Sequence, residues 1–95
     1  MTYIRLSIVR PRRGEEKRVE ELIRKLAEAL ATTEGCLGSY VLRPADESGE
    51  LARIAMYENE GVAEKAANTQ HIMSLRSELH LFTEPEQVER AFFSL

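Results

Sequence analysis

The sequence contains no tryptophan, a single cysteine and only two histidines. Cys36 has no partner for an internal disulfide, so the chain is not a small disulfide-stapled scaffold and fits a reducing compartment. No thiols, histidines or carboxylates cluster at the spacing of metal ligands. We therefore expect neither a structural metal nor a metal cofactor.

Long apolar runs and an excess of basic residues are also missing. The apolar runs are a few residues long, far below the roughly 20 needed to span a bilayer. Arg5 and Arg10 stand where a secretory signal would need apolar residues. Thirteen Lys and Arg against sixteen Asp and Glu give a net charge of -3, the wrong sign for neutralising phosphates. We predict a cytoplasmic protein that binds neither membrane nor nucleic acid.

What the chain does contain suits one compact domain over residues 1–95. Hydrophobic residues make up 43% and charged residues 31%, enough apolar surface to form a core in a chain that stays in solution. Ninety-five residues are too few for two independent cores. The two-domain enzyme classes are thereby excluded.

The hydrophobic pattern changes period along the chain, and so it separates strands from helices. Residues 2–10 alternate, whereas residues 15 to 33 repeat their apolar positions every three or four residues and stop before Gly35. The other expected elements are strands at 36–43 and 51–58 joined by a loose loop, helical residues 61–82 with a break at Asn68 and Thr69, and a strand at 88–95.

This order of elements predicts an α+β fold of the ferredoxin-like βαββαβ type, with helices on one face of a four-stranded antiparallel sheet. We expect Ile4, Leu6 and Ile8 to lie on one sheet face and Tyr3, Arg5 and Ser7 on the other. The second face then collects apolar residues and a few polar ones: Tyr40, Leu42, Leu51, Ala55, Tyr57, Val88 and Phe92 with Arg5, Ser7, Arg53 and Arg90.

Soluble monomers rarely expose so large an apolar face. We therefore expect a homodimer joined through these sheet faces, because two-fold pairing is the commonest way to cover such a surface. Two alternatives stay open. In the first, the inward and outward faces of individual strands are the reverse of those expected here. In the second, the apolar residues are exposed one at a time and need no partner.

Three segments of the chain resemble the antibiotic biosynthesis monooxygenase (ABM) family. They are VRPRRGEEKRVEELI at 9–23, EGCLGSY at 34–40 and MYENEGVAEKAANTQHIMSL at 56–75. The resemblance implies a dimeric α+β barrel in which each subunit holds a ligand cavity between sheet and helices. It also implies the activity of cofactor-free oxygenases that act on quinols and polyketide-like phenols.

The chain departs from the family pattern at two positions. Tyr57 stands where these proteins commonly carry a tryptophan, and Ala66 where a histidine often follows, whereas the Thr69, Gln70 and His71 motif is kept. The family's haem-degrading branch has a tryptophan at the position of Ala66 and a haem-ligating histidine at that of Arg76. Both are missing, so haem degradation is disfavoured.

His71 is the first candidate for the general base, because imidazole titrates near neutral pH and can accept a phenolic proton. Helical periodicity places it at the edge of the apolar stripe. Tyr57 and Arg76 are candidate donors to an oxygen-derived anion. Each of the three also has a purely structural explanation. His71 is then a partly buried or helix-capping histidine, Tyr57 a core residue and Arg76 a member of a salt bridge.

Five further residues are candidates for binding the substrate. Tyr40 offers a ring and a hydroxyl, and Ile72 and Leu75 belong to the apolar stripe of the last predicted helix. Asn59 and Asn68 offer amides, although both stand where helix capping explains them equally well.

We hold three functional hypotheses from the sequence. The first is a cofactor-independent monooxygenase that oxidises a small phenolic or quinol substrate with O₂. The second is a non-catalytic ligand-binding or stress-associated dimer, which the replacements at Tyr57 and Ala66 favour. The third is an isomerase or lactone-processing enzyme on the same barrel, because fold alone does not determine chemistry.

Overall fold

The computed structural model describes residues 1–95 and contains four strands and three helices. In chain order they are β1 (Tyr3–Val9), α1 (Glu16–Ala31), β2 (Cys36–Leu42), β3 (Leu51–Tyr57), α2 (Glu60–Ala67), α3 (Gln70–Leu81) and β4 (Val88–Phe93). The expected α+β order is confirmed, and so is the helix break, where the Thr69 hydroxyl caps α3 by accepting from the Ile72 amide at 3.4 Å.

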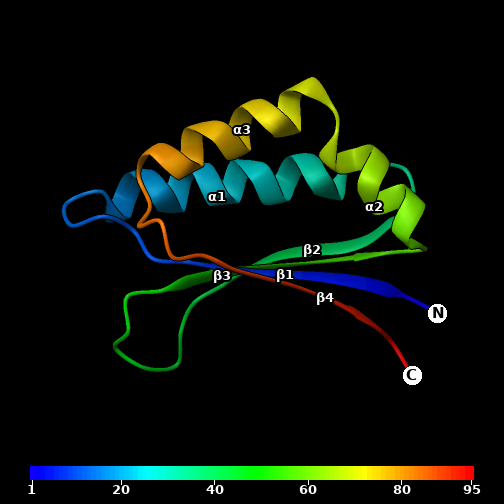
Figure 1. Cartoon of the computed structure of the whole chain (residues 1–95), viewed down its shortest axis with the longest axis horizontal. Helices are drawn as coiled ribbons and strands as arrows, with labels where there is room; N and C mark the ends of the chain where they lie inside the picture. The colour runs from blue at the N-terminus through cyan, green and yellow to red at the C-terminus, as the bar shows by residue number, and fades with distance from the viewer.

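The strands form one antiparallel sheet in the order β2-β3-β1-β4. All three helices lie over the same face of this sheet, and the other face has no covering layer (Figure 1). The ferredoxin-like topology predicted from the sequence is therefore correct. Each helix is also too short or too polar to span a membrane.

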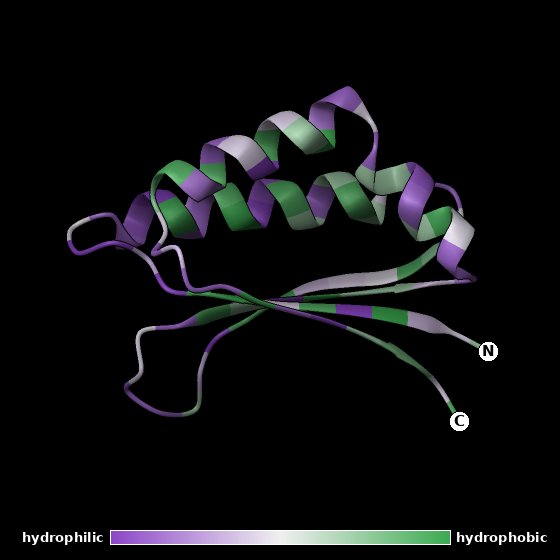
Figure 2. Cartoon of the chain, viewed as in Figure 1, coloured by the Kyte–Doolittle hydropathy of each residue, from purple (hydrophilic) through white to green (hydrophobic).

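The core lies between the helices and the covered face of the sheet. α1 contributes its apolar stripe and turns its polar residues outward (Figure 2). The strands contribute aromatic and small residues, and α2 and α3 close the layer with four more. The core residues are Tyr3, Val9, Val19, Leu22, Ile23, Leu26, Leu30, Ala55, Tyr57, Ala63, Ala66, Ile72 and Leu79.

The expected faces of β1 and β3 are wrong. In the pairing register, Tyr3 is opposite Tyr57, Arg5 opposite Ala55 and Ser7 opposite Arg53, and the buried members of these pairs pack beneath the helices. Ile4, Leu6 and Ile8 lie on the open face instead. The side of β1 with more apolar residues is thus not the side covered by the helices, because the covered side surrounds a polar cavity.

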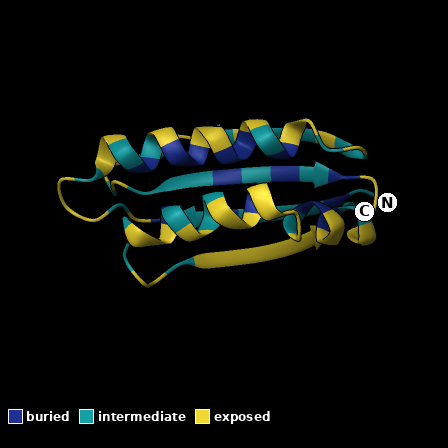
Figure 3. Ribbon diagram, turned by 90° about the horizontal axis from the view of Figure 1, so that it is seen from above, coloured by how far each residue is buried: buried dark blue, intermediate teal, exposed yellow.

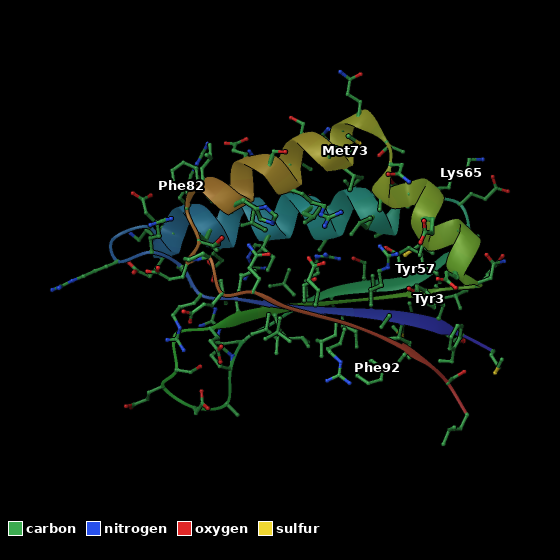
Figure 4. The ribbon with its side chains drawn as sticks, viewed as in Figure 1. Tyr3, Tyr57, Lys65, Met73, Phe82 and Phe92 are labelled. Carbon is green, nitrogen blue, oxygen red and sulfur yellow. The ribbon has the colours of Figure 1, made fainter.

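The open face is nevertheless apolar, as predicted. Tyr40, Leu42, Val88 and Phe92 are 40 to 54% exposed on it, and the view with side chains shows Phe92 projecting away from the helices (Figure 4). The residues of this open face are Ile4, Leu6 and Ile8 of β1, Tyr40 and Leu42 of β2, Ala52, Ile54 and Met56 of β3, and Val88, Arg90 and Phe92 of β4.

β4 forms one edge of the sheet and is exposed along its whole length (Figure 3). α1 packs on β2, β3 and α3, so the helical layer covers the β4 side least. A space therefore remains between α3 and the part of the sheet nearest β4, and the candidate site lies there.

Candidate functional site

A cavity of about 270 Å³ lies between the helical layer and the sheet. Its floor comes from β1 and β3, one side from β4, and its roof from α1, α2 and α3. Its lining mixes apolar and charged side chains: Tyr3, Arg5, Leu6, Ser7, Leu30, Arg53, Tyr57, Ala67, Ile72, Arg76, Glu89, Arg90 and Ala91.

Tyr57 ends β3, and its ring is 2% exposed beneath the helices. Its hydroxyl forms no hydrogen bond with another protein group. Burial raises the pKa of this hydroxyl above its ordinary value, although the nearby positive charge of Arg53 acts in the opposite direction. At neutral pH Tyr57 therefore carries its proton and can donate it in a hydrogen bond to a molecule in the cavity.

Four arginines line the cavity. The guanidinium of Arg90 lies over the Phe92 ring on the open face, so Arg5, Arg53 and Arg76 bring positive charge to the helix-covered side. Arg5 pairs with Glu64 at 3.5 Å, and Arg76 pairs with Glu89 at 3.6 Å. Arg53 has no carboxylate partner, and its one hydrogen bond goes from Nη2 to the Ser7 hydroxyl at 3.2 Å. Burial lowers the pKa of Arg53, and the charges of Arg76 and Arg5 lower it further while Tyr57 and Glu89 oppose them.

The sheet register assembles this cluster. Arg53 is opposite Ser7 on β1, and Arg5 is one pair further along the same face. Tyr3 is hydrogen-bonded to Arg5, whose Nε donates to the Tyr3 hydroxyl at 3.4 Å. Figure 4 shows Tyr3 and Tyr57 close together on the helix side of the sheet. The polar residues of the two central strands thus face the same cavity.

Three of the residues predicted from the sequence meet in the cavity. Tyr57 and Arg76 face it as potential hydrogen-bond donors, and Ile72 supplies an apolar wall. Arg76 also has the salt bridge that the structural alternative anticipated.

His71 does not line the cavity. α3 buries Ile72 and Leu79, so the preceding residue is rotated by about 100° toward the outside of the helical layer. There His71 is exposed in a shallow surface groove beside Lys25, Glu28 and Leu75. The predicted position of His71 at the core boundary is therefore corrected, and the geometry gives it no contact with a ligand in the cavity.

The other four predicted binding residues also lie elsewhere. Tyr40 is 54% exposed on the open face of the sheet, and Leu75 is half-buried in the surface groove of His71. The Asn59 side chain accepts from the Val62 amide at 2.9 Å and so caps α2. Asn68 is the exposed C-cap residue of the same helix. The two asparagines thus follow the capping alternative.

Sequence reasoning missed Arg5, Ser7, Arg53 and Glu89 as cavity residues. A signal for Arg53 is present, because a charged residue in the middle of an otherwise apolar strand needs a specific environment. Only the strand register shows that its neighbour across the sheet is Ser7. No group of three or more His, Cys, Asp and Glu side chains lies close enough together to hold a metal ion.

Comparisons with solved structures support the same fold over nearly the whole chain. Rv0793 of Mycobacterium tuberculosis superposes with a TM-score of 0.91 at 14% identity, covering 100% of this chain and 96% of that one. A variant of SnoaB, a cofactor-independent oxygenase of Streptomyces nogalater, gives a TM-score of 0.86 at 14% identity, covering 98% and 92%. A Nitrosomonas europaea protein described as a possible antibiotic biosynthesis monooxygenase superposes with a TM-score of 0.90 at 15% identity. The match covers 99% of this chain and 90% of that one.

These identities establish similarity of fold alone. None of the curated proteins matches the chain in sequence. The family model described as antibiotic biosynthesis monooxygenase matches residues 3–76, which include β1, β3, α3 up to Arg76 and therefore most of the cavity lining. The chain belongs to the antibiotic biosynthesis monooxygenase family.

Proposed function

We propose that the protein is a cofactor-independent monooxygenase that oxidises a small phenol or quinol with O₂ in the cavity above β1 and β3. For a hydroquinone, one oxygen atom enters the ring to give a hydroxyquinone. The second oxygen atom leaves as water with the two hydrogens that the substrate loses. The observation that carries the proposal is Tyr57, a residue that lines the cavity of an ABM family member and whose hydroxyl has no hydrogen-bond partner in the protein.

The chemistry needs an electron-rich substrate anion and a donor for the reduced oxygen. Positive charge nearby lowers the pKa of a bound phenol, because it stabilises the phenolate more than the neutral form. Arg76 places a guanidinium at the cavity wall, where its salt bridge to Glu89 offsets part of the charge, and Arg53 adds a second guanidinium that has no carboxylate partner. The Tyr57 hydroxyl, kept protonated by its burial, donates to the oxygen-derived anion as charge develops on it.

The proposed active form is a homodimer in which two copies cover each other's open sheet faces. The apolar residues of the open face support this arrangement, since a face of several hundred square ångströms exposed on a monomer would be unusual. Pairing across a two-fold axis leaves both cavities on the outer, helix-covered sides of the two sheets.

Oxygen uptake with hydroquinone and its alkylated derivatives tests the proposal. Tyr57→Phe removes the donor and keeps the ring, so we expect the rate to fall by about a hundredfold to a thousandfold, the range for loss of one preorganised donor. The unfolding transition should move little, because no protein hydrogen bond is lost. Unchanged oxygen uptake in Tyr57→Phe would remove Tyr57 from the mechanism.

His71→Ala tests the other sequence candidate in the same assay. We expect turnover equal to that of His80→Ala, a matched control on the exposed surface of the same helix, because both side chains lie outside the cavity. A loss of about tenfold or more in His71→Ala alone would assign the general-base role to His71.

A second candidate function is ligand binding without turnover. Three observations favour it: no histidine lines the cavity, Glu89 is paired with Arg76, and burial raises the pKa of Tyr57. None of these groups is an obvious base at neutral pH. A quinol that raises the melting temperature without consuming O₂ would support binding over oxidation.

A further inference from the structure

Arg53 is a charged group in an unusual position. The residue is 8% exposed at the centre of the sheet, and no carboxylate lies within salt-bridge distance of its guanidinium. Of its N–H groups, one is satisfied by the Ser7 hydroxyl. Burying a guanidinium in this way is costly, and native structures rarely leave such a charge unpaired.

The two neighbouring arginines differ from Arg53 in this respect. The cation of Arg5 is balanced by Glu64, and that of Arg76 by Glu89, while their side chains are 30 to 34% exposed. Arg53 is thus both the most buried and the least compensated of the three. One positive charge in the cavity remains without a counter-charge from the protein.

We propose that Arg53 is an anion-binding subsite that takes a carboxylate group of the ligand. A guanidinium offers parallel N–H donors that match the two oxygens of a carboxylate, and the singly charged group balances the one uncompensated cation. A phosphate dianion would leave an excess negative charge at the same place. The assignment refines the proposed function, on which it rests, to aromatic carboxylic acids with a phenolic ring.

The cavity orders the two ends of such a ligand. Arg53 and Ser7 occupy neighbouring strands at the middle of the sheet, whereas Tyr57 is two pairs further along β3, at its end. A carboxylate at Arg53 therefore leaves the ring extending toward Tyr57 and the apolar wall of Ile72. The phenolic oxygen then meets the hydroxyl donor, and the carboxylate determines which way round the ring binds.

Calorimetric titration of the full chain tests the subsite with matched probes. We use 2,5-dihydroxybenzoate, its methyl ester, benzoate and benzamide, so each acid is compared with an uncharged analogue of nearly the same shape. We expect each acid to bind about tenfold to a hundredfold more tightly than its analogue, the range for hydrogen bonds to a charged group. Equal affinity of acid and analogue for the unmodified protein would overturn the proposal without any variant.

Two variants locate the effect. Arg53→Gln should reduce the acid-to-ester affinity ratio to about one while leaving ester binding in place. Arg13→Gln removes the same charge from an exposed position, and it should leave the ratio unchanged. Retention of the preference in Arg53→Gln, or its loss in Arg13→Gln, would place the selectivity outside Arg53.

Oxygen uptake separates this inference from the proposed function. If hydroquinone consumes O₂ but acids have no advantage in binding, the subsite is wrong and the oxidation stands. If the acids bind through Arg53 but no phenol or quinol consumes O₂, the subsite stands and the oxidation is wrong.

Discussion

At the scale of single residues, the cavity is defined by two polar groups that the protein leaves incompletely paired: the Tyr57 hydroxyl, and the Arg53 guanidinium with its single hydrogen bond to Ser7. The residues Tyr57 and Arg53 are 2% and 8% exposed, and burying polar groups that the protein satisfies only in part costs stability. Residues that cost stability where they stand are often kept for function, because only a ligand or a transition state completes their hydrogen bonds. Substitutions at both residues therefore have predictable effects on the free energy of unfolding, independent of any activity.

The raised pKa of Tyr57 predicts that the free energy of unfolding falls at alkaline pH. Because the folded-state pKa is raised by burial, folded protein holds this proton more tightly than the unfolded chain does. The resulting contribution is complete below the ordinary tyrosine pKa of about 10 and is lost as the pH rises through the folded-state value. Urea unfolding between about pH 8 and pH 11 should show a steeper fall in unfolding free energy for the unmodified protein than for Tyr57→Phe. Parallel curves for the two proteins would contradict the shift.

We expect the Arg53→Met variant to be at least as stable as the unmodified protein. Methionine keeps most of the side-chain length and removes an uncompensated buried charge, so we expect the unfolding free energy to stay the same or to rise by about 1–4 kcal/mol. Arg53→Lys keeps a charge and should bring no such gain. A loss of more than about 2 kcal/mol in Arg53→Met would mean that the arginine stabilises the fold.

The sequence identifies only part of this cavity, and the reason differs between residues. The sequence predicts Tyr57 because it ends a strand, and it predicts Ile72 and Arg76 because they lie on or beside the apolar stripe of α3. His71 is adjacent to the buried stripe, so a rotation of one helical position decides whether it faces inward. Arg53 and Ser7 meet only through the pairing register, which no single strand contains.

At the scale of elements, the turn before β2 connects the sheet to the helical layer. Gly35 has a φ of 87°, and its carbonyl accepts from the Glu58 amide at 2.9 Å, at the end of β3. A β-carbon at this position would lie 2.7 Å from Cγ1 of Val62 on α2. Glycine is therefore required both by the backbone conformation and by the close approach of α2.

Gly35→Ala should destabilise the protein by roughly 2–4 kcal/mol, the sum of backbone strain and overpacking against Val62. Gly14→Ala is the matched control, because Gly14 has the same φ of 87° but open space around it. In a Val62→Ala background the two substitutions should cost about the same, since the close contact is gone. Equal costs in the unmodified background would show that Val62 does not constrain the turn. Chemical denaturation measures all five variants: the two glycine substitutions, Val62→Ala alone, and each glycine substitution combined with Val62→Ala.

Element order follows from the sequence more readily than element facing. The periodicities of β1 and α1 and the break at Thr69 predict the topology correctly. The facing of β1 and β3 does not follow, because the rule that the more apolar side faces the helices fails when both sides are covered or when one surrounds a polar cavity. Arg5 and Ser7 make the inner side of β1 look like an outer one.

At the scale of the whole molecule, the apolar open face of the sheet predicts the oligomeric state. Ile54 lies in the middle of the open face, paired with Leu6 of β1 on one side and Tyr40 of β2 on the other. We expect the protein to be a dimer at micromolar concentration and Ile54→Lys to be a monomer, because dimer formation would bury an unpaired charge. Sedimentation equilibrium measures the masses directly.

Met73→Lys is the control for this experiment. Met73 is 51% exposed on α3, on the side of the molecule opposite the open face (Figure 4), and its replacement adds the same charge. We expect this variant to remain a dimer. If it dissociates like Ile54→Lys, added charge alone weakens association, and if the unmodified protein is a monomer, the apolar open face has a different partner. Because the cavity lies on the covered side of the sheet, monomeric Ile54→Lys should still bind a ligand there, which separates the assembly of the protein from its chemistry.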